Sequence, residues 1–142
     1  MIKQLHISNY ALISELDISF ADGLTIITGE TGAGKSIILG ALSLILGERA
    51  DAKAIRDKSA KTIVEATFDI GGYHLEPFFQ ENDIDWDEHE CLIRRELSPN
   101  GRSRAFINDI PVQLVTLKEL STRLLDIHSQ HSNMLLSHPS FQ

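Results

Sequence analysis

The feature that most constrains this 142-residue chain is a glycine-rich octapeptide at residues 29–36. It fits the pattern G-x-x-x-x-G-K-[ST], in which glycines let the backbone curl so that successive N–H groups point inward and cradle phosphate oxygens. The lysine of this pattern reaches the β- and γ-phosphates of a nucleotide, and the hydroxyl after it ligates Mg²⁺. The pattern predicts a nucleotide triphosphate site made by Gly29, Glu30, Thr31, Gly32, Ala33, Gly34, Lys35, Ser36 and Ile37.

The residues on either side of the octapeptide support this prediction. Residues 24–28 are β-branched and apolar on both faces, as in a strand buried in the middle of a sheet. After Lys35, the apolar residues Ile38, Leu42 and Ile45 recur at helical spacing, reinforced by Leu39, Ala41 and Leu46. Gly47 is a natural helix stop. A buried strand that ends at the glycines and a helix that begins there are the context in which this motif binds phosphate.

The rest of the chain predicts further strands and one more long helix. Alternating apolar residues indicate half-buried strands, and the expected ranges are two strands within 2–20, then 62–68, 91–97 and 104–108. Residues 98–101 contain Asn-Gly, a strong hairpin signal, and Asn108-Asp109 offers a second turn. Residues 48–61 are expected to be irregular. The acidic residues 73–90 predict a surface excursion with a short helix at 77–81, and leucines at 117, 120 and 124 predict a helix ending near Asp126.

Charge and composition limit which partners the chain can have. The formal net charge is −7, so bulk electrostatics oppose a phosphate backbone and any nucleic-acid contact must be local or indirect. The one basic cluster noted in the sequence is interpreted as solvated strand and hairpin positions, namely Arg94, Arg95, Arg102 and Arg104. No apolar run approaches the ~20 residues of a membrane span. The single cysteine, Cys91, is expected to be a buried small apolar side chain, and the protein is expected to be cytoplasmic.

Nucleotide hydrolysis needs more than the octapeptide, because a carboxylate must hold Mg²⁺ through water and another group must position the attacking water. Leu124-Leu125-Asp126 falls on a helical spacing, and Asp87-Glu88 follows no buried strand. The sequence pattern therefore predicts no catalytic carboxylate in these 142 residues, and we expect the chain alone to bind a nucleotide without hydrolysing it.

Several segments together resemble the start of the RecN family of bacterial DNA repair ATPases, in the SMC-like branch of ABC ATPases. These segments are the run at 7–10, the P-loop with its preceding strand at 24–37, Leu46-Gly47-Glu48-Arg49-Ala50, Gly101 to Asn108, and Ile127-His128-Ser129-Gln130-His131. The early position of the P-loop, the Gly-Arg-Ser-Arg hairpin and the His-Ser-Gln-His segment make the resemblance specific. It covers most of the chain and fades across 73–90.

The resemblance implies an α/β fold with a mixed sheet, a P-loop NTPase lobe that is the N-terminal half of an ABC/SMC-type head. Residues 1–142 would be a single ATP-binding lobe, and a C-terminal lobe beyond a coiled coil would add the ABC signature and the catalytic glutamate. ATP would join two such heads face to face in DNA double-strand break repair, in the cytoplasm and at the nucleoid. The implied cofactors are ATP and Mg²⁺.

The resemblance also implies roles for particular residues. Lys35 and Gln130 would be catalytic, with Gln130 in the Q-loop position near the attacking water, and Ser36 and Gln130 would contact Mg²⁺. Arg56 falls where related heads place an arginine near DNA or the γ-phosphate. The pair His128 and His131 is interpreted as local packing, since zinc needs three or four ligands.

Two other functions stay open at this point. A P-loop kinase acting on a small molecule would need an acceptor pocket and usually an arginine-bearing lid, and a two-stranded hairpin at 94–104 makes a poor lid. A non-catalytic nucleotide-binding module is the second alternative. ATP-dependent pairing of heads would distinguish an ATPase head from a kinase. Phosphate release would distinguish both enzymes from a non-catalytic binding module. The sequence Leu97-Ser98-Pro99-Asn100-Gly101 resembles an ABC signature superficially, but its predicted hairpin excludes that reading.

Overall fold

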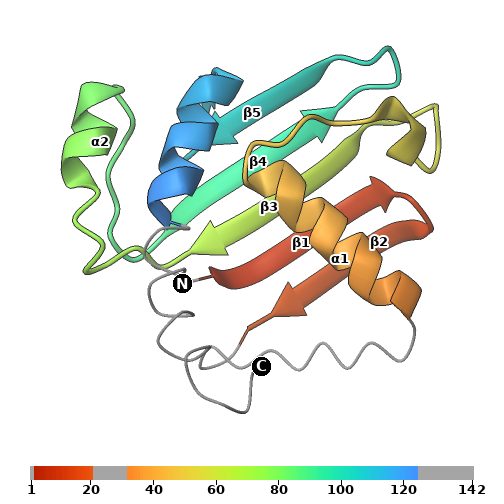
Figure 1. Ribbon diagram of the computed structural model, residues 1–142, viewed down its shortest axis with the longest axis horizontal. Helices are drawn as coiled ribbons and strands as arrows, with labels where there is room; N and C mark the ends of the chain where they lie inside the picture. The colour runs from red at the N-terminus through yellow and green to blue at the C-terminus, as the bar shows by residue number, and fades with distance from the viewer. Residues whose placement is uncertain (1, 21–31, 125–142) are drawn as a thin grey trace, which may run out of the picture.

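The computed structural model describes residues 2–20 and 32–124, which build one six-stranded sheet with helices packed on one face (Figure 1). The strand order is β2-β1-β3-β4-β5-β6, and every described neighbouring pair is antiparallel. The strands are β1 (Ile2–Tyr10), β2 (Ile13–Ser19), β3 (Thr62–Phe68), β4 (Cys91–Leu97), β5 (Ser103–Ile107) and β6 (Ile110–Val112). The strand expected at 24–28 lies outside the described residues.

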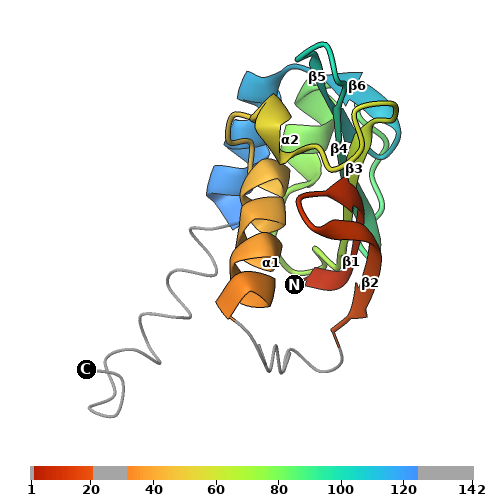
Figure 2. The same cartoon turned by 90° about the vertical axis from the view of Figure 1, so that its right-hand side faces the viewer.

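The helix α1 (Gly32–Ile45) and a helix at residues 114–124 lie on the same face of the sheet, as the side view in Figure 2 shows. The 3-10 turn η1 (Ala52–Ala54) lies at the end of the sheet where β3 begins. The short helix α2 (Glu76–Glu81) lies at the opposite end, between β3 and β4 in the chain. The helices predicted at 77–81 and around leucines 117–124 both form, and the expected end of the second near Asp126 lies outside the described residues.

The core fills the space between the sheet and the two long helices. Alternate residues of β3 and β4 are buried, as expected where successive side chains point to opposite faces of a sheet. The buried residues of the sheet and helices are Leu5, Ile7, Val64, Ala66, Ile93, Ile107, Ile38, Ala41, Leu44, Ile45, Leu117, Leu120 and Leu124. Leu39 was expected to reinforce the apolar face of α1, but its side chain is 61% exposed. The buried face of α1 is therefore carried by Ile38, Ala41, Leu44 and Ile45.

The strand predictions agree with the structure except at one edge. Both strands within 2–20 form, the strands at 62–68 and 91–97 have the expected bounds, and the strand expected at 104–108 spans Ser103–Ile107. The turn at Asn108-Asp109 also forms, with φ of 51° and 65°, the left-handed values that a two-residue hairpin turn needs. It leads into β6, which was not predicted because it has three residues and contains Pro111. Proline lacks the N–H that a central strand requires, but an edge strand tolerates it.

Residues 73–90 are more than the surface excursion that their acidic composition predicted. Phe78 and Phe79 are fully buried, and the ring of Phe79 lies 5.0 Å from that of Trp86 in an edge-to-face arrangement. The segment therefore closes one end of the core while its carboxylates face outward. Cys91, the next strand's first residue, is buried as expected, and burial raises the pKa of its thiol to about 12.

Candidate functional site

The candidate nucleotide site lies at the start of α1. The helix begins at Gly32, so Gly32 to Lys35 of the motif form its first turn, and that turn contains no acidic residue. The first N–H groups of a helix have no intrahelical partner and carry the positive end of the helix dipole, which favours an anion. Ser36 is exposed there. Gly29, Glu30 and Thr31 lie outside the described residues, as do Gln130, His128 and His131.

Two contacts fix α1 along its length. Ile38, Ala41 and Ile45 face the sheet and are buried in the core. On another side, Tyr10 at the end of β1 lies so close to Gly40 that a Cβ on Gly40 would be 2.5 Å from the tyrosine oxygen. Burial raises the pKa of Tyr10. The glycine therefore allows the end of β1 to approach the middle of the helix that carries the motif.

The C-terminal end of α1 is held by a buried arginine. Arg95 of β4 is 2% exposed, and its Nη1 donates to the carbonyl oxygens of Leu44, at 2.8 Å, and Glu48, at 2.9 Å. Its Nη2 donates to Ser103 Oγ in β5 at 2.5 Å. A cation is favourable at the negative end of a helix dipole. Burial lowers the pKa of the Arg95 guanidinium.

Arg95 and its neighbour do not belong to a surface cluster, which corrects the interpretation drawn from the sequence. Arg94 points to the other face of β4, where its ring partner is Phe106 at 4.4 Å and its ion-pair partners are Glu96 at 3.3 Å and Asp109 at 3.2 Å. Strand alternation separates the two adjacent arginines. Of the four arginines in the predicted cluster, Arg102 and Arg104 are the exposed ones.

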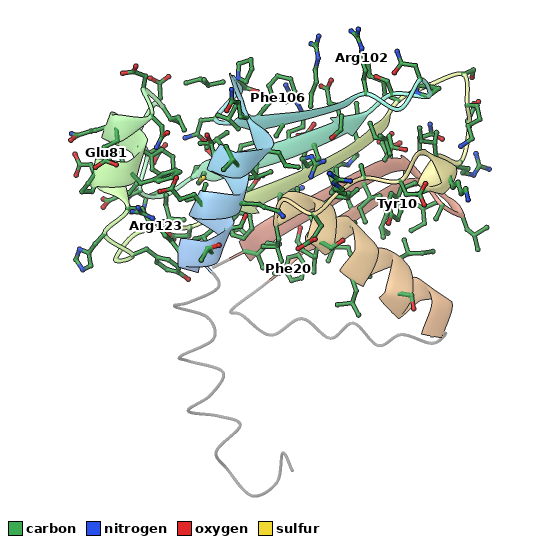
Figure 3. All side chains as sticks on the ribbon, turned by 45° about the horizontal axis from the view of Figure 1, so that its top comes forward. Tyr10, Phe20, Glu81, Arg102, Phe106 and Arg123 are labelled. Atoms are coloured by element: carbon green, nitrogen blue, oxygen red, sulfur yellow. The ribbon has the colours of Figure 1, made fainter. Side chains whose placement is uncertain are left out.

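A second basic segment lies at the same end of the sheet as Arg102. Residue pairing places the start of β3 beside the end of β4 and the start of β5, so residues 49–61 and 98–104 lie at a common end, here called the basic end. Its cationic residues are Arg49, Lys53, Arg56, Lys58, Lys61, Arg102 and Arg104. Arg56 was noted from the sequence through the family resemblance alone, whereas Arg49, Lys53, Lys58 and Lys61 were not recognised as a cluster because uncharged and acidic residues separate them. Figure 3 shows Arg102 at this end and Glu81 at the opposite one.

The opposite end is acidic. Residues 69–90 contain no lysine or arginine, and their carboxylates are Asp69, Glu76, Glu81, Asp83, Asp85, Asp87, Glu88 and Glu90. The two ends of the sheet therefore differ in the sign of their charge, whatever the net charge of the whole chain. The net charge of the whole chain does not describe the basic end, because the Debye length of ~8 Å at physiological salt lets local charge dominate.

Asn9 fixes the loop that carries Arg56. Its backbone has a φ of 57°, and its buried side-chain Nδ2 donates to the carbonyl oxygens of Asp57, Ala60 and Lys61 at 2.9, 3.1 and 3.2 Å. Its Oδ1 accepts from the Asp57 N–H at 2.7 Å. Asn9 was expected in a turn between two strands, but the structure places it within β1, and asparagine's tolerance of positive φ was the signal that could have marked it. Arg56 itself is exposed.

The remaining expectations about the site can be compared with the described residues. The segment 97–101 forms the β4–β5 hairpin, with Ser98 N donating to Arg102 O at 2.8 Å, so the resemblance to an ABC signature is excluded as predicted. Asp87 and Glu88 are exposed in the loop before β4.

Within residues 2–20 and 32–124, His6, Glu15 and Asp17 bring possible metal-ligand atoms within 4.8 Å of one another. His6 Nδ1 is hydrogen-bonded to Asp17 at 2.6 Å, which accounts for this group as a cross-strand pair.

Among the described helices, none combines the length and apolar character needed to cross a lipid bilayer.

Comparisons with known proteins identify relatives across the whole chain. A family model described as an AAA domain matches residues 4–140. The DNA repair protein RecN of Vibrio cholerae is 42% identical over 142 residues, covering 100% of this chain and 26% of that protein. RecN of Bacillus subtilis is 42% identical over 137 residues, covering 96% of this chain and 24% of that protein. The chain thus spans about a quarter of the length of these relatives.

A solved structure from a study of ATP-driven dimerization and DNA-stimulated activation of SMC ATPases has the same fold. Its TM-score is 0.66 at 23% identity, covering 87% of this chain and 79% of that one. At this identity the likeness concerns the fold alone, and it agrees with the expected P-loop lobe of an SMC-type head.

Proposed function

This chain belongs to the AAA domain family, and on that premise we propose that residues 29–37 bind the triphosphate of ATP together with Mg²⁺. The similarity to RecN that its motifs indicated is borne out by relatives in several bacteria. Lys35 contacts the β- and γ-phosphates, Ser36 ligates Mg²⁺, and the backbone N–H groups of the loop bind phosphate oxygens. The observation that carries this proposal is the place of Gly32 to Ser36 at the start of a helix that is fixed to the sheet by its core face, by Tyr10 and by Arg95.

We further propose that this lobe serves ATP hydrolysis in DNA double-strand break repair and recombination when a C-terminal lobe completes it. That lobe supplies the catalytic carboxylate, and Gln130 contacts Mg²⁺ and the attacking water. Two completed heads dimerise on ATP. The relatives are DNA repair proteins four times as long as this chain, which supports a function that needs the rest of the protein. We place this activity in the cytoplasm and at the nucleoid.

The basic end is proposed as the part of this lobe that faces DNA. Its exposed arginines and lysines project from two loops at one end of the sheet, and phosphate contacts by such side chains supply most of sequence-independent DNA binding. Asn9 holds one of these loops and the β4–β5 turn forms the other, so the charges are presented on ordered backbone.

The kinase alternative is disfavoured by the β4–β5 hairpin. A lid must open and close over its substrate. Arg95 and Ser103 instead fix this hairpin to α1, and β5 is paired on both sides in the sheet. A non-catalytic nucleotide-binding module remains the alternative for the chain by itself.

The test is calorimetry of Mg-ATP binding to the wild type and Lys35→Ala. We expect Lys35→Ala to weaken binding at least tenfold, about 1.4 kcal/mol, without unfolding the protein. Lys53→Ala, which removes an exposed lysine from η1, is the control and should bind normally. Equal affinities of wild type and Lys35→Ala would refute the site.

Measuring phosphate release tests the second part of the proposal, that ATP is hydrolysed only when a C-terminal lobe completes the site. The chain alone should hydrolyse ATP negligibly, and addition of the C-terminal lobe should restore turnover. Robust turnover by the chain alone, abolished by Lys35→Ala, would mean that these 142 residues contain a catalytic carboxylate.

A further inference from the structure

Arg95 is a buried charge whose hydrogen bonds join two parts of the fold. Its guanidinium contacts the carbonyl oxygens of Leu44 and Glu48 at the C-terminal end of α1 and the hydroxyl of Ser103 at the start of β5. The planar fork of an arginine can make all of these bonds at once, whereas a lysine ammonium is a single point donor. β4, β5 and α1 therefore meet at one side chain.

Ending the helix does not require this arginine. Gly47 has a φ of 94°, its N–H donates to Leu44 O at 3.1 Å, and Glu48 N–H donates to Ser43 O at 3.0 Å. These are the bonds of a glycine helix cap, and they already stop α1. Burying a guanidinium also carries a desolvation cost, and the Arg95 Nε has no hydrogen-bond partner. The arginine must therefore be explained by something other than termination.

The direction of α1 gives that explanation. The helix has 14 residues and is roughly 21 Å long, with Arg95 at one end and the P-loop residues at the other. A tilt of ~5° about the C-terminal end would move the N-terminal end by about 2 Å. Phosphate oxygens must lie within hydrogen-bond distance of the first backbone N–H groups, so a displacement of that size would weaken several bonds together.

We propose that Arg95 is a positioning residue for the phosphate site: by fixing the C-terminal end of α1 to β4 and β5, it sets where the N-terminal end presents the P-loop. This inference rests on the proposed binding of ATP. Arg95 does not touch the nucleotide and acts through the helix. Ser103 holds the guanidinium from the β5 side, so it contributes to the same positioning more weakly.

Calorimetry of Mg-ATP binding tests the proposal in Arg95→Met, Arg95→Lys and Ser103→Ala. All measurements are made at a temperature where circular dichroism shows each variant folded. We expect Arg95→Met to bind at least fivefold more weakly than wild type, and Arg95→Lys and Ser103→Ala to lie between the two. The matched control is Arg94→Met, which removes the neighbouring arginine from the opposite face of the same strand and should stay within twofold of wild type.

A second control, Ile93→Val, distinguishes positioning of α1 from a general loss of stability. It loosens the core two residues away on the same face of β4 and leaves the contacts to the carbonyl groups of α1 in place. It should lower the melting temperature and leave ATP affinity unchanged. Hydrogen exchange gives a second readout without nucleotide: exchange of the hydrogen-bonded helix amides at residues 36–45 should rise in Arg95→Met and not in Ile93→Val.

Unchanged affinity and exchange in Arg95→Met would overturn the inference while leaving the proposed function intact. A loss of affinity in Ile93→Val equal to that in Arg95→Met would also overturn it. Failure of the wild type to bind Mg-ATP would instead refute the proposed function, and the inference with it.

Discussion

At the scale of single residues, two glycines show how backbone conformation and close approach act separately. Gly47 and Gly72 both have left-handed φ, 94° and 85°. A Cβ on Gly47 would be 2.6 Å from Lys118 Cγ and 3.2 Å from its backbone, whereas a Cβ on Gly72 would meet nothing within 4 Å. Gly47 is thus needed both for the turn after α1 and for the packing of the 114–124 helix beside it.

We predict that Gly72→Ala lowers the free energy of unfolding by about 1 kcal/mol, the cost of left-handed backbone in a residue with a Cβ. Gly47→Ala should lower it by about 3 kcal/mol, because strain and a clash with Lys118 add to that cost. Urea denaturation of both variants measures the difference. Equal destabilisation would show that the 114–124 helix shifts freely away from the turn.

Single residues also show how much of the candidate site could be predicted from the sequence. The P-loop was predicted from residue types alone because phosphate binding needs those residues at fixed spacing. The buried partners were not found, because Arg95 and Arg94 are the same residue type and only their faces differ. Strand alternation could have separated them, but the carbonyl groups that Arg95 contacts come from residues 44 and 48, about fifty positions away.

At the scale of elements, the loop that leads into β3 depends on β1. Ala11 N–H donates to Ala54 O at 2.6 Å, Tyr10 forms an isolated bridge with Ile55, and Asn9 binds the residues that follow. The segment 48–61 was expected to be irregular, and apart from η1 it is, yet these bonds order it. Its structure could not be predicted from local pattern, since every one of these partners lies more than forty residues away in the chain.

We predict that Asn9→Gly destabilises the protein by about 1 to 3 kcal/mol. Glycine keeps the positive φ free of strain, so the variant isolates the loss of the side-chain bonds to Asp57, Ala60 and Lys61. Chemical denaturation gives the cost, and hydrogen exchange should rise first in residues 55–61. The control is Asn100→Gly at the exposed β4–β5 turn, which should cost under about 0.5 kcal/mol. Similar costs in the two variants would contradict an anchoring role for Asn9.

Periodicity predicted most of the sheet and both long helices because their buried faces repeat at regular spacing. It failed at β6, which is too short to have a period, and across 73–90, where composition hid the buried pair Phe78 and Phe79. Acidic residues dominate that stretch by number, but two adjacent aromatic rings are enough to fix it to the core. Composition averages over a window and so cannot detect an anchor of two residues.

At the scale of the whole molecule, the arrangement of charge matters more than its sum. The basic and acidic groups lie at opposite ends of the strands, so a polyanion that approaches the basic end meets cations first (Figure 3). At low salt, where the Debye length is longer, the acidic end still opposes binding, and this opposition falls as salt rises. The chain alone should therefore contact DNA weakly.

We predict that the isolated chain binds duplex DNA little at ~150 mM salt and detectably at lower salt. Each phosphate contact contributes roughly −0.9 to the slope of log affinity against log salt, so replacing Arg102 and Arg104 by alanine should make the slope less steep by at most about 1.8. Arg94→Ala is the control: its guanidinium is engaged by Glu96, Asp109 and Phe106, so its removal should leave the slope unchanged. Fluorescence anisotropy titrations at several salt concentrations measure all three proteins. Submicromolar binding at ~150 mM salt that is lost in the Arg102 and Arg104 variant would contradict weak binding and make the hairpin sufficient for DNA contact, whereas an unchanged slope in that variant would remove the hairpin from the DNA-facing surface.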